Sequence, residues 1–222
     1  MKTASTITWI FISTSLVLMV VGHLGTHPLN WVSMQISTYA AKAPYDYLIT
    51  LSILCAAFAL IMLSVLVSRY KIIGEDYLTH FFPVLLGAAA AGLIMLASYE
   101  ETASTLALLK KSSFWNIRVQ SFHDAGLQIF FYSSVLFIML AGSSLIFTQP
   151  GLGTKVIALI IFSLGPASFL IMTTGLPYTE DIGGATHGLN QRAALFCLWL
   201  AVVLIMVASS QQLTASRIVS RD

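Results

Sequence analysis

The stretch from Tyr47 to Ser68 carries no charged residue. A helix needs about 20 consecutive apolar residues to cross the hydrocarbon core of a bilayer, and this stretch is long enough. Similar runs recur along the chain, so that 57% of its 222 residues are hydrophobic and only 9% are charged. Soluble domains contain about 25% charged residues. The sequence therefore predicts an all-α, polytopic integral membrane protein rather than a soluble fold.

The apolar runs predict six transmembrane helices in a single domain that covers residues 1–222, with alternately long and short connections. The first run resembles a signal peptide, but it lacks an Ala-x-Ala cleavage pattern, so we expect a retained helix. Apolar residues at helical spacing in the first two long connections are typical of helices that lie in the membrane interface. The expected spans are about 8–24, 47–68, 80–99, 122–147, 156–174 and 193–208, and the interfacial segments are about 31–43 and 103–117.

An even number of spans places both termini on the same side of the membrane. That side, which also has the two short connections, holds six of the eleven basic residues. The opposite side, with the three long connections, holds six of the nine acidic residues. Because basic residues favour the cytoplasmic side, we expect both termini in the cytoplasm and a multi-pass protein of the plasma (inner) membrane.

Small and helix-breaking residues mark two of the spans. Gly87 to Gly92 is a run of glycine and alanine in which small residues recur four apart, a pattern that lets helix backbones approach closely. Gly165 and Pro166 fall near the middle of the fifth span, where the proline should kink the helix and release a carbonyl group.

Several function classes lack their sequence signatures. The net charge is only +2 and there is no basic run, so no nucleic-acid partner is expected. The chain has no Gly-x-Ser-x-Gly, His-Glu-x-x-His or Cys-x-x-Cys-His motif. Cys55 and Cys197 lie inside apolar runs, which indicates two buried thiols rather than a disulfide or a metal pair.

Polar residues gather on the side of the long connections. His123, Asp124 and Gln128 stand where the fourth span begins, and Asp124 and Gln128 share a helix face because they are four residues apart. We expect these three to form the floor of a ligand-binding pocket. An equally simple interpretation is structural: Ser121 and Asp124 have the spacing of a capping box at a helix start, and the histidine would then bond to a neighbouring loop.

His187 and Arg192 open the sixth span and are expected on the rim of the same pocket. Arg192 keeps its charge, so it must reach water, an anion or an acidic side chain. A salt bridge is the structural alternative to binding a lipid headgroup. His23, at the end of the first span, could join His123 and His187 as a third metal ligand.

Three functional hypotheses follow. In the first, the protein is not an enzyme but binds, senses or helps to move a small molecule or a membrane lipid through its headgroup. In the second it is a membrane hydrolase in which His123, His187 and either His23 or His27 hold zinc and a carboxylate activates water. In the third it is a structural subunit of a larger complex or oligomer, and the polar face is a docking surface.

Three short motifs resemble a family of bacterial and archaeal six-helix membrane proteins known only as a domain of unknown function (number nine-nine-eight). They are the segment from His27 to Pro44, the histidine that opens the fourth span, and Gly188-Leu-Asn-Gln-Arg192. The resemblance implies a six-helix fold over nearly the whole chain, and no settled activity. The family's marked positions fall on Ser37, His123, Gln191 and Arg192. This chain departs from the pattern at Tyr99-Glu-Glu101, where the family has an aspartate-bearing stretch.

Overall fold

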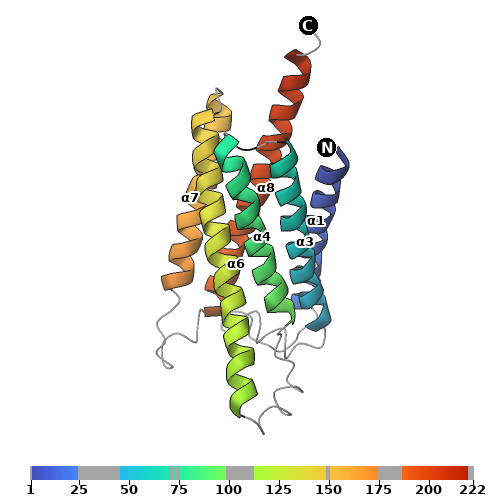
Figure 1. Cartoon of the computed structure of the whole chain (residues 1–222), viewed down its shortest axis with the longest axis vertical. Coiled ribbons are helices and arrows are strands. Elements are labelled where there is room, and N and C mark those ends of the chain that lie inside the picture. The colour runs from blue at the N-terminus through green and yellow to red at the C-terminus, as the bar shows by residue number, and fades with distance from the viewer. Residues whose placement is uncertain are drawn as a thin grey trace.

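The structure is a computed structural model, and it describes residues 2–24, 46–70, 73, 76–98, 113–148, 151–174 and 187–219. These residues form six long α-helices (Figure 1), which span 23 to 36 residues each. The helices are α1 (Lys2–Leu24), α3 (Asp46–Tyr70), α4 (Asp76–Ser98), α6 (Ser113–Thr148), α7 (Leu152–Thr174) and α8 (His187–Val219).

All six helices contain an apolar segment long enough to cross a membrane. The expected all-α fold with six spanning helices is confirmed, and the described residues contain no strand. The helix ends differ from the expected spans. In particular, residues 113–117 were expected in a surface-lying segment, but they form the first turns of α6. The expected interfacial helix at 31–43, and the rest of the second one at 103–112, lie outside the described residues.

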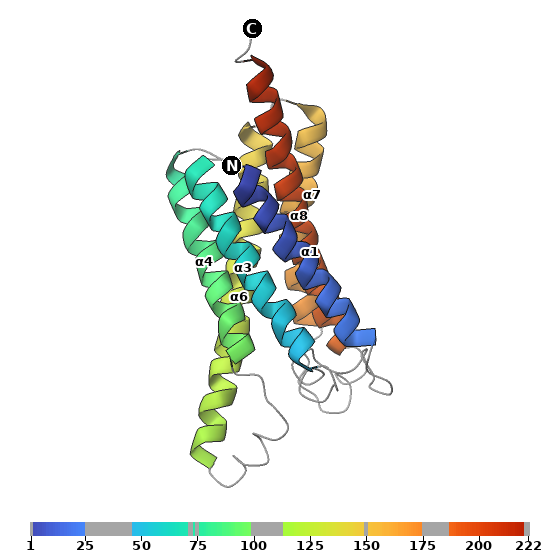
Figure 2. The ribbon, with the colours of Figure 1, turned by 90° about the vertical axis from the view of Figure 1, so that its right-hand side faces the viewer.

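Successive helices run in opposite directions, so the N-terminal end of α1 and the C-terminal end of α8 lie at the same end of the bundle (Figures 1 and 2). At that end α8 extends past its neighbours. At the opposite end the start of α6 projects beyond the other helices (Figure 1). That opposite end, which we call the long-connection end, also holds the end of α1 and the start of α8.

Each helix packs closely against the next one along the chain, and α6 also touches α8. The closely packed pairs of described helices do not include α1 and α8. A continuous apolar core runs through the bundle, and its largest fully buried side chains include Phe82 and Phe137, whose rings meet edge to face at 5.6 Å. The six helices therefore form a nearly closed ring. This ring, rather than a broad interface of their own, brings α1 and α8 near each other.

Glycines lie at two close contacts between helices. A Cβ added at Gly92 of α4 would lie 2.5 Å from the backbone nitrogen of Phe130 in α6. A Cβ added at Gly142 of α6 would lie 2.5 Å from the backbone nitrogen of Phe162 in α7. Close helix packing is thus confirmed at Gly92, whereas Gly87 is exposed and an added Cβ there would meet nothing within 4 Å.

Helix α7 continues through Pro166, and Ser168 Oγ donates a 2.8 Å hydrogen bond to the carbonyl of Gly165. The carbonyl that loses its helical donor at Pro166 is that of Phe162, four residues earlier, so the Ser168 bond is an additional one beside the proline and does not replace the missing one.

Helix α4 also contains a proline, Pro83, whose carbonyl accepts a 3.4 Å hydrogen bond from Ser64 of α3. Both cysteines are free thiols; Cys55 is buried as expected, whereas Cys197 is only half-buried.

A lateral groove between the first and last helices

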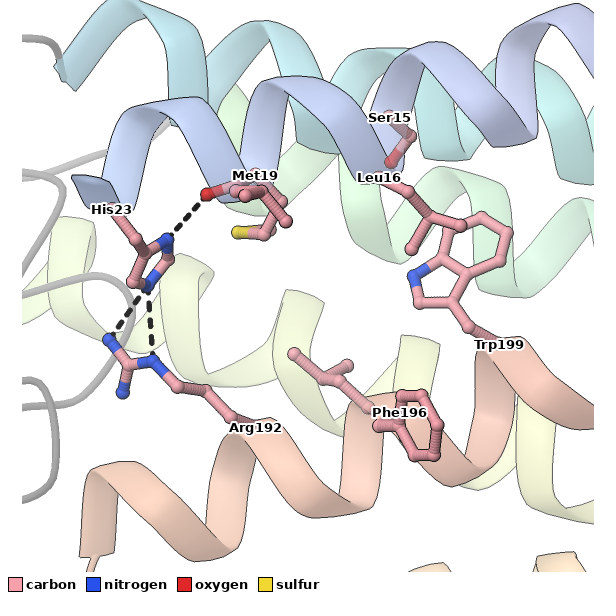
Figure 3. A pocket seen from close by; sticks show the side chains of 9 residues that line it. Ser15, Leu16, Met19, His23, Arg192, Phe196 and Trp199 are labelled. Atoms are coloured by element: carbon pink, nitrogen blue, oxygen red, sulfur yellow. Dashed lines mark hydrogen bonds between the residues drawn. The ribbon is translucent and has the colours of Figure 1, made fainter. Parts of the chain in front are cut away.

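A groove with a volume of about 390 Å³ separates α1 from α8. Figure 3 shows its side chains pointing toward one another from the two helices. Most of the lining is aliphatic or aromatic, and two basic side chains lie at one end. The lining residues are Ser15, Leu16, Met19, Val20 and His23 of α1, and Arg192, Leu195, Phe196 and Trp199 of α8. The volume is in the usual range for small-molecule sites, about 300–1,000 Å³.

The polar end of the groove is a hydrogen-bonded bridge between the two helices. Arg192 Nε and Nη2 lie 3.1 and 3.0 Å from His23 Nε2. The other ring nitrogen, His23 Nδ1, lies 2.6 Å from the carbonyl oxygen of Met19 (Figure 3). Since a carbonyl only accepts and a guanidinium only donates, this geometry assigns a neutral imidazole that donates from Nδ1 and accepts at Nε2. The bridge therefore fixes the orientation of the Arg192 side chain relative to α1.

The other end of the groove is anchored by a serine pair. Ser15 of α1 is buried, and its carbonyl accepts a 2.7 Å hydrogen bond from Ser52 Oγ of α3. The two hydroxyl oxygens are 3.3 Å apart. This contact fixes α1 to α3 at the depth where Trp199 closes the groove on the α8 side. Trp199 also borders a second, much smaller void inside the bundle.

The side of the groove that faces away from the bundle consists of exposed apolar groups. Leu16 is 40% exposed, Val20 is 56% exposed and Phe196 is 66% exposed. In a helix bundle with six membrane-spanning segments, such groups face the lipid. The groove is therefore open on the side that faces the lipid.

The expected pocket floor lies on α6, but the position of the helix start was wrong. Helix α6 begins at Ser113, so Ser121, His123 and Asp124 lie two turns inside it rather than at its N-terminus. The capping-box interpretation of Ser121 and Asp124 is therefore incorrect, because an interior helical residue has no orphan amide to cap. The side chains of His123 and Asp124 lie outside the described part of the structure, and their role in binding stays a prediction. Gln128 is exposed and does not line the groove.

Of the expected rim residues, Arg192 lines the groove, whereas the His187 side chain is outside what the structure describes. The zinc hypothesis needs His123 and His187 together with His23, so it also stays a prediction. Among the described residues, no three His, Cys, Asp or Glu side chains are grouped so that they could hold a metal ion. Gln191, next to Arg192, is buried.

The pairing of His23 with Arg192 was not anticipated from the sequence. Both residues were assigned to the polar cluster on the long-connection side, but with different roles, His23 as a metal ligand and Arg192 as a rim residue. The order in which the helices pack is the one feature that indicates this pairing. Helices that each pack on the next one in the chain form a ring, and a ring brings the first helix beside the last. The groove itself has no sequence signal, since Leu16, Val20 and Phe196 are ordinary residues of an apolar span.

A family model described as "Protein of unknown function (DUF998)" matches residues 11–208. The chain belongs to this family, which confirms the resemblance noted in the sequence. The matched region includes all six membrane-spanning segments from Phe11 onward, and thus every residue that lines the groove. Comparisons with curated proteins and with solved structures find no match. The family identifies an integral membrane protein of unknown activity and assigns no role to the groove.

Proposed function

We propose that the protein is a non-enzymatic membrane protein that binds an amphipathic molecule of the membrane in the groove between α1 and α8. The observation that carries this proposal is the distribution of polarity along the groove. Its basic end lies at His23 and Arg192, and apolar side chains follow from there to Trp199. A molecule with a polar head and an apolar tail matches that order.

The depth of the groove supports the same assignment. His23 is the last residue of the apolar segment Thr3–His23, and Arg192 lies in the first turn of the segment Leu189–Ala208. The basic end is thus near the membrane boundary, and Trp199 lies seven residues deeper. At about 1.5 Å per helical residue, this is about 10 Å toward the bilayer centre. A membrane lipid has its headgroup and chain at these same depths.

We further propose that the protein lies in the plasma (inner) membrane with both termini in the cytoplasm, so that the groove opens into the outer leaflet. The excess of basic residues on the side of the termini supports this orientation. A green fluorescent protein fused after Asp222 should then fluoresce, because it folds in the cytoplasm. Alkaline phosphatase at the same position should be inactive. The reverse pair of results would place the groove in the inner leaflet.

Whether a lipid occupies the groove can be tested by filling the groove with larger side chains. The double variant Leu16→Phe/Val20→Phe adds two rings within it, and Val17→Phe/Val21→Phe adds the same two rings to the exposed face next to it. Each variant is purified in mild detergent, and co-purified lipid is measured by native mass spectrometry. We expect the groove-filling variant to lose most of the bound lipid that wild type and the control retain.

Equal lipid retention by both double variants would contradict binding in the groove. A wild-type protein that carries no lipid after purification, and that regains none from added lipid, would do so as well. Thermal stability in detergent serves as a control for folding, because all four positions are partly exposed or lipid-facing and both variants should remain folded.

A further inference from the structure

The polar side chains of the groove indicate what kind of molecule it would select, on the premise that the proposed function is right. Four of the nine lining residues have side chains that form strong hydrogen bonds: Ser15, His23, Arg192 and Trp199. Arg192 donates to His23, and Ser15 contacts Ser52 of α3. The indole N–H of Trp199 makes no hydrogen bond to any other residue in the described ranges. Among the side chains that line the groove, this donor is therefore the one that a ligand would satisfy.

The depth of Trp199 in the membrane explains why its N–H needs a particular acceptor. Tryptophan in membrane proteins usually lies at the interface, where its N–H reaches water or lipid headgroups. Trp199 lies seven residues further along α8 than Arg192, which is about 10 Å deeper. One leaflet of the hydrocarbon core is only about 15 Å deep, half of the total of about 30 Å. Bulk water and headgroups are thus out of reach, while the indole nitrogen points into the space between the two helices (Figure 3).

The surroundings of the indole favour a carbonyl oxygen as the acceptor. Leu16, Leu195 and Phe196 line the same part of the groove, and a donor left without an acceptor in such apolar surroundings costs free energy. A carbonyl oxygen accepts a hydrogen bond and brings no donor of its own. A hydroxyl group would add a second donor, and the nearest serine, Ser15, is only 2% exposed and already contacts Ser52. A plain acyl chain has no acceptor at this depth.

We propose that Trp199 is a specificity-determining residue whose Nε1–H donates a hydrogen bond to a carbonyl group in the apolar part of the ligand. The groove then selects amphipathic molecules that have a carbonyl group about 10 Å below their polar head, at the depth of Trp199. Over the same molecule without the carbonyl group, the expected preference is about fivefold, which corresponds to one hydrogen bond of about 1 kcal/mol.

Three radiolabelled fatty acids test the preference, and each is bound to the full-length protein in mild detergent in a scintillation proximity assay. The first is stearic acid, the second has a keto group near the middle of the same chain, and the third has the keto group next to the terminal methyl group. We expect the mid-chain keto acid to bind about fivefold more tightly than stearic acid. The third acid should bind no more tightly than stearic acid, because its carbonyl group lies beyond Trp199.

Two variants show whether the indole N–H is the donor. Trp199→Phe keeps an aromatic ring and removes the N–H, so the affinity for the mid-chain keto acid should fall about fivefold, to that of stearic acid, whose own affinity should not change. Trp9→Phe is the matched control. Trp9 is a half-buried tryptophan of α1 that packs against the core and does not line the groove, so this variant should keep the full preference.

A spectroscopic measurement reads the same hydrogen bond without a change at position 199. The three other tryptophans, Trp9, Trp31 and Trp115, are replaced by phenylalanine, and the protein is washed free of lipid. Ultraviolet resonance Raman spectroscopy then follows the indole band that shifts when the N–H donates a hydrogen bond. We expect this band to shift when the mid-chain keto acid is added and to stay in place when stearic acid is added.

Three results would overturn the inference and leave the proposed function intact. They are equal affinities of the wild type for the mid-chain keto acid and stearic acid, a preference that survives Trp199→Phe, and an indole that already donates a hydrogen bond in the lipid-free protein. A different result would contradict the proposed function, and the inference with it: binding of both acids that is the same in Leu16→Phe/Val20→Phe as in wild type. The acids would then be bound outside the groove.

Discussion

Helices α4 and α6 pack with their backbones in close contact, whereas α1 and α8 are separated by a groove. At Gly92 and Gly126 the backbones meet so closely that an added Cβ at either position would fall within 2.9 Å of backbone atoms of the other helix. Between α1 and α8 the backbones stay apart, and the bridge is made by long side chains, His23 and Arg192. Small residues exclude any third molecule from the first interface, while the second one leaves room for such a molecule.

The difference follows from what drives helix association in lipid. Apolar side chains gain little by leaving one apolar medium for another, so tight association depends on close packing and hydrogen bonds. Helix α6 has glycines where it meets α4 and α7, whereas the facing sides of α1 and α8 have Leu16, Met19 and Phe196. A groove therefore persists where the ring of helices would otherwise close. This contrast can be tested at three places in the bundle.

The largest loss of stability is expected for Gly92→Ala, which disturbs the close packing between α4 and α6. The new Cβ would meet the backbone of α6 at 2.5 and 2.6 Å, so the two helices must move apart. We expect the free energy of unfolding to fall by about 1–3 kcal/mol, the usual cost of overpacking. Thermal unfolding in detergent measures it, with Gly87→Ala as the matched control in the same helix. Gly87 has open space around it and alanine is the better helix former, so Gly87→Ala should cause no loss. An equal loss in both variants would contradict close packing at Gly92 as the cause.

The hydrogen-bonded bridge between His23 and Arg192 should contribute less to the free energy of unfolding than the close contact at Gly92 does. His23→Ala removes the acceptor of both Arg192 hydrogen bonds, and we expect a loss of about 1 kcal/mol in the free energy of unfolding. His23→Gln keeps a side-chain oxygen that can accept from Arg192 and should recover part of the loss. If His23→Ala and Arg192→Gln destabilise independently and their effects add in the double variant, the two side chains do not form the bridge.

The smallest effect is expected at the serine pair that fixes α1 to α3. Ser52→Ala removes the donor of the 2.7 Å hydrogen bond to the carbonyl of Ser15. Hydrogen bonds between membrane helices contribute about 0.6 kcal/mol on average, so the change in unfolding free energy should be near that value. Ser163→Ala is the control, because Ser163 bonds only within its own helix, to the carbonyl of Leu159. A larger loss at Ser163 than at Ser52 would contradict the anchoring role of the pair.

The helices were predictable because each span is a long apolar run with few charges, and such runs have one stable form in lipid. The positions at which the helices begin and end were less predictable, and α6 is the clearest case. Its start at Ser113 precedes the apolar run, so Ser121 and Asp124 resemble a helix cap in a place where the helix has already begun. The site was predictable only in part. Arg192 stands out as a charge at the start of a span, but its partner His23 is 169 residues away along the chain. Only the order of helices around the ring brings them together.

The most direct measurement of whether lipid is held in the groove uses a photoreactive amino acid. Benzoylphenylalanine is placed at Phe196, which is 66% exposed within the groove, or at Leu170, which is 59% exposed on the outer face of α7. Both proteins are washed extensively in detergent, illuminated and analysed by mass spectrometry. If the groove holds a lipid, an adduct of lipid mass persists at position 196 and is lost at position 170. Detergent adducts alone at both positions, or equal lipid adducts at both, would show that the groove is an ordinary part of the lipid-facing surface.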